Sequence, residues 1–129
     1  MTGETLEPTR GKLERSLAQR IQALYRQALG HQTSQAFCNL LDNKLMVAIE
    51  NAISQPEKLL AQNGQGALAS QVRSPLESVL ELQLKDLITQ VLGVGVTDLL
   101  SDATLETGRT GTIAILESVP KVRDSRLFS

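Results

Sequence analysis

The chain repeats one order of local patterns, and this repetition limits the folds open to it. A helical stretch ends in Leu29-Gly30 and is followed by two short apolar runs; a second ends in Leu92-Gly93 and is followed by two more. Glycine commonly supplies the left-handed residue that ends a helix. Because 129 residues suit one compact domain, we predict an α+β two-layer sandwich. The expected order is helix-strand-strand-helix-helix-strand-strand, with an antiparallel sheet of about four strands.

The first helix is predicted over residues 10–29. Five basic residues and a single acidic one, Glu14, lie in this stretch. Such a charged face is usually solvated, and an anionic surface or nucleic acid is the alternative reason for it. The apolar residues recur at steps of three and four, which stacks them on one face; they are Leu13, Leu17, Ile21, Leu24 and Ala28.

Residues 35–51 change to a period of two, which is typical of strands. Asp42-Asn43 interrupts the alternation and tolerates the positive φ of a tight turn, so we predict a β-hairpin. Both faces of this hairpin are apolar. We expect helices to cover one face, and a second subunit is a candidate cover for the other.

Two segments have the form of helix starts: Ser-Gln-Pro-Glu at 54–57 and Ser-Pro-Leu-Glu at 74–77. They predict a short helix over 56–62 and a long one over 75–92, with a helical turn over 67–73 as an addition. The apolar arc of the long helix is wider than one sheet needs. Burial against a second chain explains it, and a close fit against the first helix is the alternative. We therefore predict a homodimer with Leu82 or Leu92 near the interface.

The last two apolar runs, 94–100 and 110–116, predict two strands separated by a polar loop. The expected domain covers residues 10–118. We expect a flexible N-terminus over 1–9 and a flexible C-terminal tail over 119–129.

Three segments of the chain resemble the MpsC-like family. They are Tyr-Arg-x-x-Leu-Gly at 25–30, Asn-Leu-Leu-Asp-Asn-Lys-Leu at 39–45, and Val-Leu-Gly-Val-x-Val-x-Asp-Leu-Leu-Ser-Asp-x-x-x-x-Thr-Gly at 91–108. These are small bacterial proteins, mostly described as a domain of unknown function and sometimes labelled Na-translocating. The resemblance implies an association with a membrane transport system for cations or inorganic carbon, and it implies no catalytic residue.

The residue types for catalysis or metal binding are scarce in this sequence. A nucleophilic triad needs a base, and His31, the only histidine, is far in sequence from Ser101 and Cys38. One histidine and one cysteine form no metal-ligand set at characteristic spacing, and the glycine-rich segments lack the lysine of a phosphate loop. We expect no enzymatic activity, no metal and no cofactor, an exposed His31, and an inert, buried Cys38 thiol.

The candidate site is the hairpin over residues 101–111. In one interpretation it is structural: Asp102 accepts hydrogen bonds from loop amides and pairs with Arg109. In the other, the planar guanidinium of Arg109 binds a carboxylate, phosphate or bicarbonate, or a partner docks here. A hard cation held by Asp98, Asp102 and Glu106 is a weaker alternative. The candidate ligand- or partner-binding residues are Ser101, Asp102, Thr107, Gly108 and Arg109.

Composition restricts the function classes. Thirteen basic and fourteen acidic residues leave a net charge of −1, so no strong field attracts nucleic acid or membrane. A single cysteine fits a reducing compartment, and neither a leader's apolar region nor a membrane-spanning stretch is present in the sequence; we expect a cytoplasmic protein without membrane insertion.

We therefore expect a non-enzymatic adaptor or regulatory module that acts through protein contacts, as a homodimer, with a membrane transport or regulatory protein as a further partner. The competing hypothesis is a sensor that binds an anion or nucleotide at the 101–111 hairpin. Nucleic-acid binding through the basic first helix is a third hypothesis, and we do not expect it.

Overall fold

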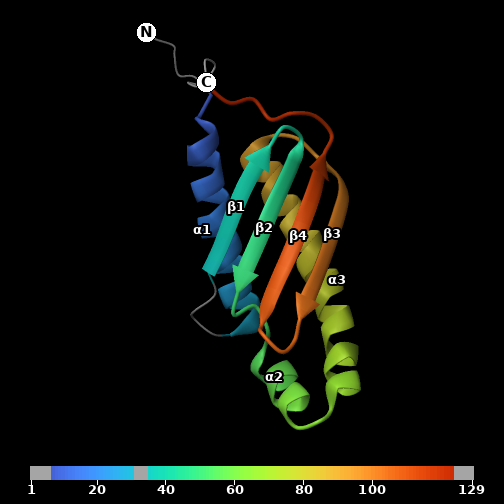
Figure 1. Ribbon diagram of the computed structural model, residues 1–129. Helices are drawn as coiled ribbons and strands as arrows, with labels where there is room; N and C mark the ends of the chain where they lie inside the picture. Colours follow the sequence, from blue (N-terminus) through green and yellow to red (C-terminus); the bar gives the residue numbers. More distant parts are fainter. Residues whose placement is uncertain (1–6, 31–34, 124–129) are drawn as a thin grey trace.

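The computed structural model describes residues 7–30 and 35–123. Within these residues three helices and four strands follow the order α1, β1, β2, α2, α3, β3, β4, which confirms the predicted α+β fold. The strands form one antiparallel sheet in the order β1-β2-β4-β3. Figure 1 shows α1 and α3 behind this sheet, while none of the helices in the described part of the chain covers its front.

Helix α1 spans Arg10–Leu29, as predicted. The Thr9 side chain accepts a hydrogen bond from the Lys12 amide at 3.2 Å, and Gly30 ends the helix with a φ of 76°. The prediction of its apolar face is wrong at the C-terminal end of the helix, because Tyr25 is buried and Ala28 is exposed. A row at steps of four forms the ridge that packs against the sheet layer; its members are Leu13, Leu17, Ile21 and Tyr25.

Strands β1 (Gln35–Leu41) and β2 (Lys44–Glu50) form the predicted hairpin. Asp42 lies in its turn with a φ of 55°. The Glu14 carboxylate of α1 accepts a hydrogen bond from the Leu40 amide at 2.7 Å. This bond ties α1 to the edge strand β1 and occupies one of the edge amides.

Helix α2 spans Gln55–Gln62 and begins with the predicted capping box. Helix α3 spans Gly66–Leu92, so the prediction of a separate helix beginning at Pro75 is wrong. Proline inside a helix removes one backbone hydrogen bond. Tertiary contacts offset that loss, because Ala69 and Arg73 before Pro75 and Leu80 after it are all buried.

Strands β3 (Val96–Thr104) and β4 (Arg109–Leu116) form the second hairpin. Strand β3 continues beyond the predicted end at Leu100, so most of the expected polar loop is strand. Polar residues are tolerated here because β3 is an edge strand. One of them, Ser101, hydrogen-bonds through its hydroxyl to that of Thr112 at 2.8 Å.

The core lies between the sheet and the helices and is aliphatic apart from Tyr25. Leu92 belongs to this core, whereas the side chain of Leu82 is 65% exposed. The segment after β4 packs on the same unit: Pro120 is buried, Val122 contacts the core, and the Arg123 amide donates to the Pro8 carbonyl at 2.8 Å. Residues 119–123 are therefore part of the packed fold. His31 lies outside the described residues.

Candidate interaction surface

We call the sheet surface turned away from α1 and α3 the open face (Figure 1). Successive side chains in a strand point to opposite sides, so every second residue belongs to it. On β2, for example, Leu45, Val47 and Ile49 are buried on the helix side. The open face comprises Phe37, Asn39 and Leu41 of β1, Lys44, Met46, Ala48 and Glu50 of β2, Arg109, Gly111, Ile113 and Ile115 of β4, and Asp98, Leu100, Asp102 and Thr104 of β3.

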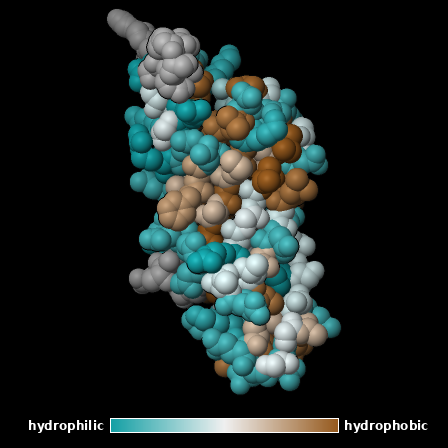
Figure 2. Space-filling model, viewed as in Figure 1, coloured by the Kyte–Doolittle hydropathy of each residue, from teal (hydrophilic) through white to brown (hydrophobic). Residues whose placement is uncertain are grey.

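The centre of the open face is apolar and strongly exposed. Phe37 is 58% exposed and Leu100 61%, and Met46 and Ile113 are exposed as well. These residues border a shallow hollow of about 680 Å³ whose floor includes Ala48 and Gly111. A β-carbon placed on Gly111 would meet no atom within 4 Å. Figure 2 shows apolar side chains gathered over the upper half of this sheet face.

The two ends of the open face on β2 and β4 carry charges. The Arg109 Nε donates to both Glu50 carboxylate oxygens, at 2.9 and 3.1 Å. Both side chains are substantially exposed, so this pair contributes little to folding stability. Lys44 is at the other end of β2. The face therefore has an apolar centre and a polar rim, which is the usual composition of a protein interface.

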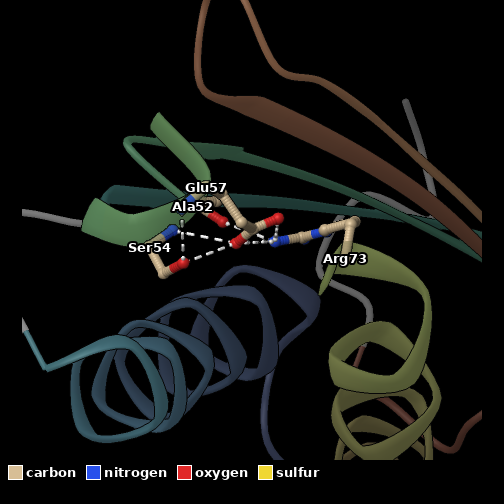
Figure 3. A network of polar contacts seen from close by, with 4 residues as sticks. All are labelled: Ala52, Ser54, Glu57 and Arg73. Carbon is tan, nitrogen blue, oxygen red and sulfur yellow. Dashed lines mark hydrogen bonds and ion pairs between the residues drawn. The ribbon is translucent and has the colours of Figure 1, made fainter. Parts of the chain in front are cut away.

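A buried polar network lies where β2 leads into the helices (Figure 3). Glu57 is fully buried, and its carboxylate accepts hydrogen bonds from the Ser54 amide at 3.0 Å and the Ser54 hydroxyl at 2.8 Å. The Arg73 Nη1 of α3 donates to Glu57 Oε1 at 3.3 Å and to the Ala52 carbonyl at 3.2 Å. This network joins the end of β2, the start of α2 and the first half of α3.

The capping box of this network was predictable, because Ser54 and Glu57 are three residues apart. Arg73 was missed, because its partner is sixteen positions earlier and nothing in the local pattern connects the two. Both the burial of this arginine and its pairing with a carboxylate become evident only when the fold is known.

The residues predicted as a site in the 101–111 hairpin do not converge on one point. Ser101 bonds to Thr112 on the helix side of the sheet, while Asp102 lies on the open face and accepts a hydrogen bond from the adjacent Ala103 amide at 2.8 Å. Arg109 pairs with Glu50 of β2, and not with Asp102 as the structural interpretation had it.

The turn of this hairpin is held by neighbouring segments. The Thr107 hydroxyl hydrogen-bonds to that of Thr104. Gly108 has a φ of 78°, and its carbonyl accepts a hydrogen bond from the Ala52 amide at 2.7 Å. These bonds serve the hairpin's own structure, and the anion site stays a prediction.

The other chemical candidates can be located in the same way. Among residues 7–30 and 35–123, no group of three histidine, cysteine, aspartate or glutamate side chains is placed to hold a metal ion. Cys38 is half-buried on β1. Burial raises the pKa of its thiol to about 12, and the nearby Glu14 carboxylate adds to this effect. A thiol in this environment reacts slowly, because the thiolate is the nucleophile.

A second apolar strip lies on the helical layer. Val79 and Leu82 of α3 are exposed there, and a groove between α1 and α3 is lined by Leu24 and Leu76 among others. Leu82 is thus available to a second chain, while Leu92 has little surface left outside the core.

The chain was compared with known families, curated proteins and solved structures. A family model described as MpsC, Na+-translocating membrane potential-generating system, matches residues 9–118. No curated protein and no solved structure matches the chain. Among the helices of the described part of the chain, none combines the length and the apolar character needed to cross a membrane.

Proposed function

Because the chain belongs to the MpsC family, we propose that it is a non-enzymatic accessory module of a Na+-translocating membrane potential-generating system and that it acts through protein contacts. The family's name supplies the link to that system. The open face supplies the reason to expect protein contacts.

The observation that carries the proposal is the exposed apolar centre of the open face. Monomeric proteins rarely leave large contiguous apolar patches uncovered. Small-molecule sites are concave and enclose most of their ligand, whereas the hollow over Ala48 and Gly111 lies on the surface of a sheet. A broad apolar surface with charges at its rim suits another protein surface better.

The sensor hypothesis has weaker support. Its main anion-binding group, the Arg109 guanidinium, is already paired with the Glu50 carboxylate. An anion would have to replace that carboxylate, which itself offers good geometry for a guanidinium. Nucleic-acid binding rests on the basic face of α1 alone, in a chain whose net charge is −1.

The proposal is tested by complementation in cells that lack the protein. The readout is the Na+-dependent membrane potential, followed with a voltage-sensitive dye. Wild-type protein should restore the potential, and Leu100→Lys should not, because a charge would replace an apolar contact on the open face. Leu59→Lys is the matched control: Leu59 is 62% exposed, nearly the same as Leu100, but it lies on α2, away from the open face.

Two results would contradict the proposal. One is an unchanged potential in cells that lack the protein. The other is full restoration by Leu100→Lys at wild-type expression level. Loss of function in the Leu59→Lys control as well would count against a specific role for the open face.

A further inference from the structure

The open-face residues of β2 are arranged symmetrically about Val47. In chain order they are Lys44, Met46, Ala48 and Glu50. The inner two are a large and a small apolar residue, and the outer two carry opposite charges. A half-turn about Val47 therefore exchanges large with small and positive with negative.

The centre of this symmetry extends across the sheet as a straight line. Strand register pairs Cys38 with Val47, Val47 with Thr112, and Thr112 with Ser101. These residues point to the helix side, so the line runs between two rows of open-face side chains. One row contains Phe37, Ala48, Gly111 and Asp102; the other contains Asn39, Met46, Ile113 and Leu100.

A second copy turned by 180° about this line would bring the two rows over each other. Met46 would lie over the partner's Ala48, and Ile113 over the partner's Gly111. Each large side chain would enter the hollow above a small residue, as close packing of two sheets requires. On the outer strand β1, Phe37 would cover the partner's Asn39.

The charges at the ends of β2 would match as well. Lys44 would lie over the partner's Glu50, and the two-fold axis creates this pair twice. On β3, the same axis would place Leu100 over the partner's Asp102, at the rim of the contact. Asp102 would then keep its contact with water.

The other in-plane two-fold axis, parallel to the strands, gives poorer packing. It would bring Glu50 over the partner's Arg109, which is also a complementary pair. It would however bring Met46 over the partner's Ile113 and Ala48 over the partner's Gly111. Large residues would then meet large ones and small residues would face an unfilled gap. The packing of large against small residues therefore favours the axis that runs across the strands.

The flat area of the open face is close to the minimum that a specific dimer needs. Four strands at about 4.8 Å spacing and seven residues at about 3.4 Å rise give a face of about 19 by 24 Å. Its plane covers about 450 Å², so two copies bury about 900 Å² before side-chain relief adds to the total. That value lies just below the about 1,000 Å² that a specific interface should exceed, and the relief of the side chains supplies the difference.

We infer that the open face is a homodimer interface in which a second copy of this chain is related by the two-fold axis over Cys38, Val47, Thr112 and Ser101. The inference rests on the proposed function, since both require the open face to be covered by protein. It adds the identity of the covering protein and the geometry of the contact.

The test uses two charge-reversal variants, Lys44→Glu and Glu50→Lys. In a dimer of either variant, like charges face each other twice, so the dissociation constant should rise at least about tenfold. In an equimolar mixture, one chain carries glutamate at both positions and the other lysine, so both pairs become complementary and the dimer should re-form. Light scattering during gel filtration gives the mass of each sample, with wild type expected at twice the 14.0 kDa chain mass.

The control variant is Lys58→Glu, the same charge change at an exposed position on α2; it should dimerise as wild type does. Thermal unfolding checks that each variant is folded. A wild-type monomer at high micromolar concentration would overturn the inference. So would a dimer that survives both variants but dissociates with Leu82→Asp, or a mixture of the two reversals that stays monomeric.

These outcomes separate the inference from the proposed function. If the wild-type chain is monomeric while Leu100→Lys still fails to restore the membrane potential, the inference is wrong and the proposed function stands. If the dimer forms as described but cells without the protein keep their potential, the proposed function is wrong and the dimer stands.

Discussion

The buried pair of Glu57 and Arg73 is the residue-scale feature with the largest expected effect on stability. The carboxylate is fully buried, and its hydrogen bonds reach three segments of the chain. Breaking such a pair leaves one charge buried without its partner. Glu57 and Arg73 therefore stabilise the junction as a unit.

We expect Arg73→Ala to lower the free energy of unfolding by about 3 to 5 kcal/mol, because the Glu57 charge would stay buried and unpaired. Arg109→Ala should change it by less than about 0.5 kcal/mol, because the pair of Arg109 with Glu50 is exposed. Urea unfolding followed by circular dichroism measures both values. Equal losses in the two variants would contradict the assignment of the stabilising pair.

Asp102 offers a further contrast. If Asp102 accepted hydrogen bonds from several loop amides, its replacement by alanine would lower the free energy of unfolding by about 1 to 3 kcal/mol. The structure shows an exposed carboxylate that bonds to the neighbouring amide of Ala103. We therefore expect a loss of about 0.5 kcal/mol or less for Asp102→Ala, by the same urea measurement, and a loss above about 1 kcal/mol would restore the earlier interpretation.

The Cys38 thiol should be protected from alkylation in the native state. Its pKa is about 12, and an unperturbed thiol has a pKa of about 8.5. Near pH 8 the thiolate population is therefore smaller in the folded protein, and iodoacetamide should react at least about a hundredfold more slowly than in urea. Equal rates in the two states would show that the thiol is neither buried nor shifted.

The same shift makes stability depend on pH in a defined direction. The folded state holds the thiol proton more tightly than the unfolded state does. The contribution of the Cys38 thiol to the free energy of unfolding is therefore complete below about pH 8.5 and is lost as the pH rises toward about 12. Burial also raises the pKa of Tyr25, which acts in the same direction. The free energy of unfolding should therefore fall above about pH 9. In the Cys38→Ala variant it should fall less steeply with pH. An identical pH profile for this variant would contradict the assignment.

At the scale of elements, the predictions that succeeded rest on local signals. The four-residue steps of α1, the alternation of β1 and β2 and the cap at Ser54 each involve neighbours in sequence. The errors arise where distant contacts outweigh a local signal. Pro75 suggested a helix start, but buried residues on both sides of it keep α3 continuous.

Replacing Pro75 tests this explanation. The residue is exposed, and its ring removes the amide that would bond to the Gln71 carbonyl. Pro75→Ala should therefore raise the free energy of unfolding by about 1 to 3 kcal/mol, measured by urea unfolding. A destabilised variant would show that the helix needs the geometry imposed by proline.

At the scale of the whole molecule, the sequence indicated a second subunit as a candidate cover for one sheet face, because both faces of the first hairpin are apolar. It did not predict which residues share that face, because the pairing of β2 with β4 joins positions from Ile49 and Thr110, 61 residues apart, to Lys44 and Ile115, 71 residues apart. The order of Lys44, Met46, Ala48 and Glu50, which is complementary to its own reverse in size and charge, is present in the sequence. It indicates a self-complementary surface only once the strand and its exposed side are known.

The open face and the strip around Leu82 both present exposed apolar side chains, and a direct comparison of them tests the central claim. Ile113→Cys and Leu82→Cys, each combined with Cys38→Ala, report on one surface each through the rate of maleimide labelling. We predict that raising the protein from low to high micromolar concentration slows labelling about tenfold or more at position 113, as dimer replaces monomer, and leaves position 82 unchanged. Protection at position 82 with unchanged labelling at position 113 would contradict the claim that the open face is covered by protein.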